Sequence, residues 1–448
     1  MRRIGLALLV MAVSPAWTHS ANAAVRPRYG GTLRVAIQAA PLSIDPNDSV
    51  QANSVSLPSV SRLIFETLVV IDEHGEPQPW LASSWQAEPG NQRWQFSIPR
   101  GVTFSDGSPL TPDTVAASLR SANPKWKIFP AADAVMIECE VADPFLPAEL
   151  AQTRYGIAKR DQPLRGTGPF AIKEWSPGKK LILIARDDYW SGRAFVDSVE
   201  IELGKAARDQ MIALDVGKLD LSEVSPETAS VANDRRIQRS LPVQWVGLVF
   251  APAEARLREA LGLSIDRATI NNVLLRGSGE VTGSFLPEWM LGYSFLFPVS
   301  RNLDRARQLT SETRASGAWS LSFDSSDPLL RLIAERIVLN AKDAGLSLQL
   351  SNASSADITL VRLMPASTEP HIALGNLLAR LGFPAPTFEN ASPSALYAAE
   401  KAALESQRVL PLFHLRSTVA LGAALRDLQQ TDSGVWRLDN VWLWAGTP

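Results

Sequence analysis

Residues that could ligate a metal or carry acid–base catalysis are few in this sequence and lie far apart. The chain of 448 residues has four histidines and a single cysteine, Cys139. Three of the histidines, His74, His371 and His414, lie beyond the first 23 residues. Structural metal sites bring several cysteines or histidines together at short, regular spacings. The composition therefore does not favour a metal site, and one cysteine allows no intramolecular disulfide.

The sequence also lacks the motifs of common catalytic and nucleotide-binding sites. It contains no G-x-S-x-G nucleophile turn, no H-E-x-x-H zinc motif and no Walker loop. Gly277-x-Gly279 has no third glycine at dinucleotide-binding spacing. A hydrolase on an unrelated fold would need a nucleophile and a base, and the sequence offers no such pair. We therefore expect a protein that is not an enzyme and carries no cofactor.

Size and charge narrow the choice of partner. The chain is long enough for two or three domains, and its hydrophobic content of 46% allows a large core. The formal net charge is −2. Such a balance gives no electrostatic reason to expect binding to nucleic acid or to an anionic membrane.

The N-terminus has the features of a secretory signal. Arg2 and Arg3 precede an apolar run over residues 4–13, which is too short to span a bilayer. Ala21-Asn22-Ala23 then fits an A-x-A cleavage site, which predicts a signal peptide over residues 1–23. Because no cysteine follows the apolar run, we expect no lipoprotein anchor. We therefore expect a mature chain that is secreted without an anchor.

Local periodicity predicts mixed strands and helices. Alternating apolar residues predict strands over 31–37 and 94–98. Thr111 before Pro112 is typical of a helix N-cap followed by proline at the first helical position. Residues 321–350 read as strand, helix and strand, a crossover that makes the two strands parallel. The sequence therefore predicts α/β structure in which helices cover sheets.

Two glycines flank Thr167 in the segment Gly166-Thr167-Gly168-Pro169-Phe170. Glycine is required where another backbone approaches closely or where φ is positive. We expect one of these two conditions at both positions.

The order of several short segments closely resembles the family 5 extracellular solute-binding proteins, the capture proteins of peptide and nickel ABC importers. The resemblance covers nearly the whole mature chain. The segments that carry it are G-G-T-L-R-V at 30–35, P-W-L-A-S-S-W at 79–85, R-G-V-T-F-S-D-G at 100–107, P-L-T-P-D-T-V at 109–115, G-T-G-P-F at 166–170, I-D-R at 265–267 and L-P-L-F at 410–413.

This resemblance implies an α/β fold of two lobes, the periplasmic binding protein fold of the type II or cluster C kind, with mixed sheets flanked by helices. Lobe one would comprise residues 25–245 and 408–448, and lobe two residues 246–407. The ligand would lie in the cleft between the lobes, where ligand sites commonly occur. Asp266 is expected to cap a helix over residues 267–275 rather than to bind ligand.

The resemblance also points to residues near the expected cleft. Trp245 and Phe250 lie on the segment that matches the crossover strand between lobes, and Trp245 is the tryptophan we select as a pocket wall. The alternative for any single tryptophan is core packing. Asn53 follows a turn in a region that lines the family's cleft, and Tyr155 is placed near the opposite rim.

The segment from Arg362 to Pro370 departs from the family pattern. Peptide-binding relatives show W-x-x-D-Y-P-D-P there, and their aspartate pairs with the peptide's α-ammonium. This chain has no aspartate in the segment. Glu369 is the nearest acidic substitute, with an exposed loop carboxylate as the alternative. His371 and His414 are candidates for contact with a ligand carboxylate or a metal chelate.

We therefore predict a periplasmic solute-binding protein that captures a small ligand between two lobes and delivers it to the permease subunits of an ABC importer. A peptide is the favoured ligand. Nickel or a metallophore chelate is the alternative within the binding class. A sensory module that presents ligand to a membrane receptor would have the same sequence features. We expect a monomer.

Overall fold

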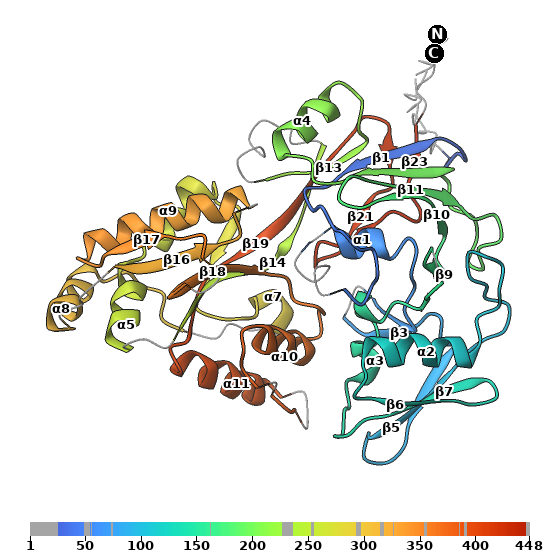
Figure 1. Ribbon diagram of the computed structural model, residues 1–448, viewed down its shortest axis with the longest axis horizontal. Coiled ribbons are helices and arrows are strands. Elements are labelled where there is room, and N and C mark those ends of the chain that lie inside the picture. The colour runs from blue at the N-terminus through green and yellow to red at the C-terminus, as the bar shows by residue number, and fades with distance from the viewer. Residues whose placement is uncertain are drawn as a thin grey trace, which may run out of the picture.

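Two long antiparallel strands run through the middle of the computed structural model and join its two bodies (Figure 1). They are β14 (Ile237–Phe250) and β19 (Val409–Leu421). We call residues 26–225 and 425–444 the large body and residues 255–405 the small body. The structure describes residues 26–48, 54, 56–72, 75–161, 163–225, 236–251, 255–292, 297–313, 318–325, 327–353, 356–384, 386–388 and 392–444.

One sheet continues from the large body through β19 and β14 into the small body. Its order is β10-β11-β12-β1-β13-β19-β14-β18-β16-β17, and β15 pairs with β19. The pairs β12–β1, β1–β13, β16–β17 and β16–β18 are parallel. The bounds of the strands in the large body are β1 Thr32–Ala36, β10 Phe170–Ser176, β11 Lys180–Ala185, β12 Ser198–Glu202 and β13 Leu221–Glu223, and those in the small body are β15 Gly279–Val281, β16 Trp319–Phe323, β17 Leu348–Leu350 and β18 Ile358–Leu363.

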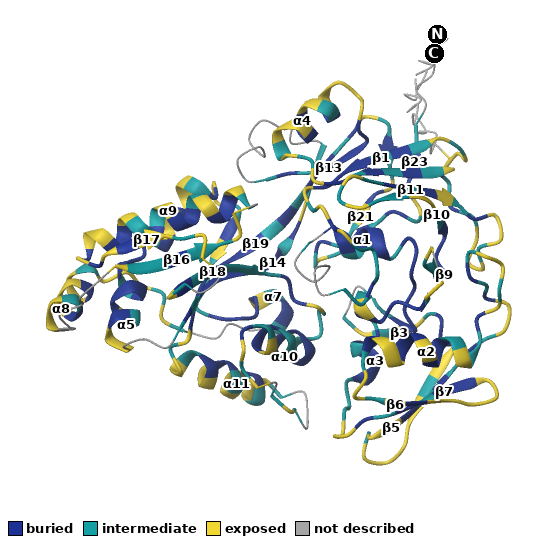
Figure 2. Cartoon of the chain, viewed as in Figure 1, coloured by how far each residue is buried: buried dark blue, intermediate teal, exposed yellow. Residues whose placement is uncertain are grey.

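The predicted first strand is present as β1, and its alternation explains its place in the sheet. Leu33 and Val35 are fully buried in the main core of the large body, whereas Thr32 and Arg34 are half-buried. The guanidinium of Arg34 pairs with Asp220 at 2.9 Å, which links β1 to the residue before β13. Figure 2 shows that the strands of this sheet are mostly buried or half-buried, while exposed residues collect on helices and loops.

A second sheet and a helix form the far end of the large body. The sheet has the order β4-β5-β7-β6, and the predicted strand at 94–98 is β5. Thr111 caps α2 as predicted, because its side chain accepts a hydrogen bond from the backbone of Thr114 and Thr114 returns one. Cys139, next to the end of β7, is a buried packing residue. The bounds are β4 Ser84–Ala87, β5 Arg93–Ser97, α2 Pro112–Ala122, β6 Lys127–Pro130 and β7 Ala134–Glu138.

Close backbone approach explains the glycines on each side of Thr167. A Cβ atom on Gly166 would lie 1.8 Å from the carbonyl oxygen of Ile64, and one on Gly168 would lie 2.5 Å from that of Leu63. Neither glycine has positive φ. The condition met here is therefore the close approach, and any larger residue would force these two segments apart.

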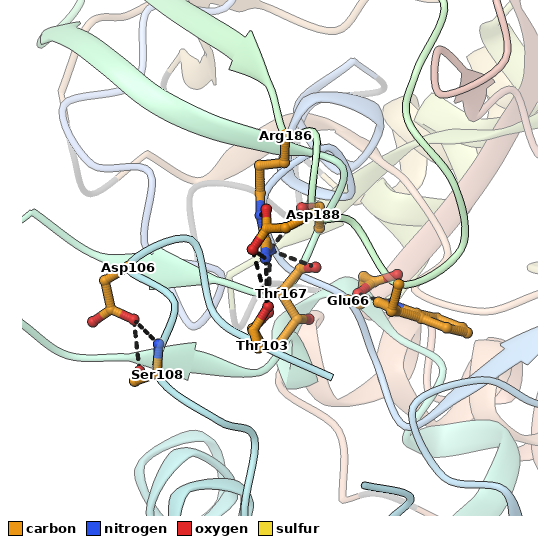
Figure 3. A network of polar contacts seen from close by, with 9 residues as sticks. Glu66, Thr103, Asp106, Ser108, Thr167, Arg186 and Asp188 are labelled. Atoms are coloured by element: carbon orange, nitrogen blue, oxygen red, sulfur yellow. Dashed lines mark hydrogen bonds and ion pairs between the residues drawn. The ribbon is translucent and has the colours of Figure 1, made fainter. Parts of the chain in front are cut away.

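Arg186 ties the same loop to the turn at residues 100–107. Its buried guanidinium donates to the carbonyl oxygens of Thr103 and Thr167, both at 3.1 Å, and pairs with Asp188 (Figure 3). Two of the family-like segments therefore contact each other through one arginine. These residues hold the scaffold together.

The small body contains the parallel unit predicted over 321–350. α9 (Pro328–Asp343) connects β16 to β17, and the Asp327 side chain caps it by accepting from the backbone of Leu329 and Leu330. Gly345 follows the helix with φ of +79°. Asp266 also caps as predicted, accepting from Thr269 at 2.9 Å, although the helix it begins is the short α6 followed by a π-helical turn.

The remaining elements complete the two bodies. In the large body they are α1 Leu57–Ser61, β2 Val69–Ile71, β3 Pro77–Pro79, α3 Leu146–Glu149, the 3-10 turn Thr153–Tyr155, β8 Ala158–Lys159, β9 Arg165–Gly166, α4 Ala207–Asp215, β20 Leu425–Arg426, β21 Gln429–Gln430, β22 Trp436–Arg437 and β23 Trp442–Leu443. In the small body they are α5 Ala255–Ser264, α6 Arg267–Thr269, the π-helical turn Ile270–Leu274, α7 Glu288–Leu291, α8 Leu303–Thr313, α10 Pro370–Arg380 and α11 Pro393–Glu405.

Both predicted lobe boundaries fall at the connecting strands. The boundary at 245/246 lies inside β14, and the boundary at 407/408 lies just before β19. The predicted signal peptide, residues 1–23, lies outside the described residues. Among the helices of the described part, none combines the length and the apolar character that crossing a membrane requires.

Candidate ligand site between the two bodies

A ring stack connects the large body to the small body away from the connecting strands. Phe145, the residue before α3, lies face to face with His371 in the first turn of α10, with ring centroids 4.8 Å apart and planes 9° apart. Phe388 of the small body packs edge-on against the same imidazole at 4.8 Å. His371 is only 4% exposed. Side chains from both bodies therefore close off the space between them here.

A carboxylate lies two residues before each stacked ring. Asp143 accepts a hydrogen bond from the backbone of Phe145 at 2.9 Å. Glu369 contacts Nδ1 of His371 at 2.8 Å through one oxygen and accepts from the backbone of Ile372 at 2.9 Å through the other. Burial raises the pKa of Asp143, and the nearby charge of Glu369 raises it further. Two acidic groups, one from each body, are thus close enough to repel each other.

A second pair of charged groups approaches across the bodies beside the connecting strands. Glu223, at the end of β13, accepts from the backbone of Gln38 at 2.5 Å. Burial raises the pKa of Glu223, while the charge of Arg362 on β18 acts in the opposite direction. Arg362 also pairs with Asp327 at 2.8 Å. The interbody region therefore has polar groups from both bodies at its inner side and aromatic groups at the ring stack.

Trp245 and His414 are cross-strand neighbours on β14 and β19, and both pack against Phe285. The Trp245 ring is fully buried and stacks on that of Phe285 at 5.5 Å. Nε2 of His414 donates to the carbonyl oxygen of Phe285 at 3.0 Å, and burial lowers the pKa of His414 to about 4. The neutral imidazole is therefore the form that fits this core.

The backbone of the same segment is held by a buried carboxyl group. Glu400 of α11 is 0% exposed and accepts from the backbone N–H groups of Phe285 and Leu286, each at 3.2 Å. Burial raises the pKa of Glu400 to about 8. Trp245, His414 and Glu400 thus all converge on one short segment of the small body.

The structure does not bring all the predicted site residues together. Phe250 lies at the end of β14 in the core of the small body. Tyr155 is buried in the far end of the large body, where its ring stacks on Trp126 at 5.0 Å and its hydroxyl donates to Glu149 at 2.5 Å. Asn53 lies outside the described residues, as does His74. Of the site residues predicted from the sequence, only Glu369 and His371 contact the region between the bodies through side chains that the structure describes.

Sequence reasoning missed three of the residues at this region, Asp143, Phe145 and Glu223. A weak signal was present, because an acidic residue precedes an aromatic ring by two positions in both Asp143-x-Phe145 and Glu369-x-His371. Such a spacing becomes meaningful only once the fold places the two segments side by side. Within the described residues, no group of three histidine, cysteine, aspartate or glutamate side chains is placed to hold a metal ion.

Two proteins with similar sequences are named for the binding of peptides. The chain is 24% identical over 384 residues to the probable D,D-dipeptide-binding periplasmic protein DdpA of Escherichia coli (strain K12), covering 75% of this chain and 72% of that protein. It is also 24% identical over 359 residues to the oligopeptide-binding protein AppA of Bacillus subtilis (strain 168), covering 68% of this chain and 64% of that protein. The chain therefore spans about two thirds of the length of these relatives.

Solved structures share the fold. The dipeptide binding protein from Pseudoalteromonas sp. SM9913, solved in complex with Met-Leu, superposes with a TM-score of 0.81 at 16% identity, over 92% of this chain and 100% of that one. This likeness confirms the predicted two-lobed α/β fold. The model of the bacterial extracellular solute-binding proteins, family 5 (its middle region), matches residues 76–394, and the chain belongs to this family.

Proposed function

We propose that this chain captures a peptide between its two bodies and delivers it to the permease of an ABC importer. Membership of the solute-binding family supports capture, and the relatives described above are named for dipeptides and oligopeptides. The observation that carries the proposal is the Phe145–His371 stack, which brings the two bodies together across the space where a ligand would lie.

The charges between the bodies favour a ligand with a cationic group. Asp143 and Glu369 approach from opposite bodies, and the charge of Glu369 adds to the burial that raises the pKa of Asp143. A ligand ammonium placed near both would offset this repulsion, since a desolvated carboxylate is stabilised by an opposite charge. The free N-terminus of a peptide supplies such a group. Arg362, which already pairs with Asp327, is the cation on the inner side of the same region.

Capture of this kind involves no bond-making step. A ligand shifts the protein toward the conformation to which it binds more tightly, and side chains from both bodies supply that difference in affinity. ATP is hydrolysed by another subunit of the importer in this scheme. The protein would work as a monomer in the periplasm, to which the predicted signal peptide would direct it. A sensory role would use the same binding step but a receptor in place of the permease.

Isothermal titration of the mature protein tests the ligand class. We expect heat on adding di- to pentapeptides, and at least tenfold weaker binding of the same peptides after N-acetylation, which removes the ammonium charge. Nickel with histidine serves as the competing ligand. If no peptide gave heat and the nickel complex bound saturably, we would conclude that the ligand is a metal chelate and not a peptide.

The partner is tested separately, with membranes that carry candidate ABC permeases. We expect the peptide-loaded protein to stimulate ATP hydrolysis by one of these importers. Capture of a membrane receptor with no stimulation of any importer would favour the sensory role.

A further inference from the structure

The large body contains a cavity that no ligand assignment above uses. It leaves about 40 Å³ for the centres of water-sized molecules, and all of its lining residues belong to the large body. The lining includes residues of α1 and of the segment that follows it, together with residues 436–439. A single water needs roughly 10–15 Å³ on this measure. The cavity therefore has room for a small inorganic species and not for a peptide.

Two arginines face this cavity without acidic partners at bonding distance. Arg62 follows the last residue of α1, and Arg437 ends β22. Both are half-buried, and neither side chain forms a hydrogen bond or an ion pair with any residue that the structure describes. Burial and the like charge of Arg437 together lower the pKa of Arg62 to about 10, although the negative charges of Asp439 and Glu66 act in the opposite direction. Two guanidinium groups held together in this way are stabilised when an anion lies between them.

Neutral donors line the same cavity. Trp436 is only 2% exposed, and its Nε1–H has no hydrogen-bond acceptor among the described residues. The hydroxyl oxygen of Ser59 accepts from the backbone of Trp436 at 2.8 Å, and no acceptor for its own proton occurs in the described part of the chain. A buried N–H without an acceptor carries a desolvation cost, which an acceptor on a ligand would remove.

Two carboxylates in the lining, Glu66 and Asp439, offset part of the positive charge at Arg62. Glu66 is already engaged, because it accepts from Trp80 at 2.8 Å, Tyr189 at 2.6 Å and Trp190 at 3.1 Å. Burial raises the pKa of Glu66, so its negative charge is disfavoured. Figure 3 draws Glu66 in the same network of polar contacts as Thr167 and Arg186. Asp439 accepts from Asn440 at 3.3 Å and is the acidic group that an anion would have to tolerate.

We propose that this cavity is a binding site for a small inorganic oxyanion of the phosphate or sulfate type, held by Arg62, Arg437, Trp436 and Ser59. The anion would join α1 to strand β22 and so stabilise the large body. Its effect is additional to ligand capture between the bodies and does not depend on it. Binding to the folded state alone raises stability in proportion to the logarithm of anion concentration above the dissociation constant.

Thermal unfolding with added inorganic phosphate or sulfate tests the site. Ionic strength is held constant with sodium gluconate, whose anion is too large for the cavity. We expect the midpoint temperature to rise by several degrees and then to increase only slowly with further anion. Arg62→Gln and Arg437→Gln should each abolish this rise. Trp436→Phe keeps the packing and removes the N–H, and it should weaken phosphate binding several-fold by calorimetric titration.

Arg100→Gln is the matched control, because Arg100 is an exposed arginine of the same body. It should keep the full response to phosphate. An equal response in wild type, Arg437→Gln and Arg100→Gln would overturn the proposal and show a general salt effect. Glycerol phosphate separates a free anion from a phosphate ester. Binding as tight as that of inorganic phosphate would contradict the size limit and overturn the assignment to an inorganic anion.

Discussion

His414 and His371 are both almost fully buried, yet their surroundings differ in kind. His414 contacts Phe285 and the strands of a single core, and its one polar partner is a backbone carbonyl. His371 contacts Phe145 from the other body and Glu369 from its own helix. Burial alone therefore does not separate a core residue from a residue at a site. What separates them is whether the neighbours belong to one rigid body or to two.

If the first region is a core, changes there should alter stability and leave ligand affinity almost unchanged. If the second region is a site, changes there should alter affinity and leave stability almost unchanged. The predictions below test this contrast, beginning with the group whose ionisation should cost most.

Glu400 should make stability fall as pH rises. Its pKa is raised from 4.5 to about 8 in the folded protein, so the folded state binds its proton more tightly than the unfolded state. The associated stability is fully present below pH 4.5 and is lost as pH rises toward 8, in total about 5 kcal/mol. Chemical denaturation from pH 4 to 9 should show this slope in wild type and a flatter one in Glu400→Gln. Parallel profiles for the two proteins would rule out a buried carboxyl group.

His414 should act with the opposite sign at lower pH. Its pKa is lowered from 6.5 to about 4, so the unfolded state binds the proton more tightly. Its contribution is fully present above pH 6.5 and is lost as pH falls toward 4, by about 3 kcal/mol. His414→Gln removes the titration, so the difference in free energy of unfolding between wild type and variant should change over this range. Peptide affinity at pH 7 should stay within about twofold, and a larger loss would place His414 at the ligand site.

The difference between the core around His414 and the region around His371 could be predicted only in part from the sequence, for physical reasons. Thr111, Asp266 and the glycines beside Thr167 were predictable because caps and close approaches depend on neighbours within a few residues or on a residue type that nothing else can replace. Trp245 and His414 lie on central strands that are buried on both faces, so their pattern does not reveal which neighbours cover them. Their predicted role in ligand binding stays a prediction.

The interbody contacts were harder still to foresee. Phe145 and His371 meet because β14 and β19 set the relative positions of the two bodies. No local pattern encodes that distance. The absence of the family's aspartate in residues 362–370 indicated where the ligand site would differ, but it did not indicate that Asp143 from the other body would lie near Glu369.

Phe145→Ala should weaken ligand binding without unfolding the protein. The variant removes the ring that stacks on His371, and stacked aromatic pairs contribute about 0.5–1.5 kcal/mol beyond the buried area. We expect peptide affinity to fall by up to about tenfold in calorimetric titration. Phe129→Ala is the control, because that ring is 51% exposed on β6 of the same body. Equal peptide affinities for wild type and Phe145→Ala would show that the stack does not contribute to ligand binding.

Asp143→Asn should have the smallest effect and the most specific one. The amide can still accept from the backbone of Phe145, so the local turn is kept while the charge near Glu369 is lost. Binding of a peptide with a free ammonium group should weaken a few-fold, because one of the two attracting charges is gone. Binding of the N-acetylated peptide should stay the same or improve. Asp133→Asn, an exposed position of the same body, should change neither affinity. If Asp143→Asn weakened both peptides equally, the carboxylate would act through the shape of the turn, and the preference for a cationic ligand would have to come from Glu369 or from elsewhere between the bodies.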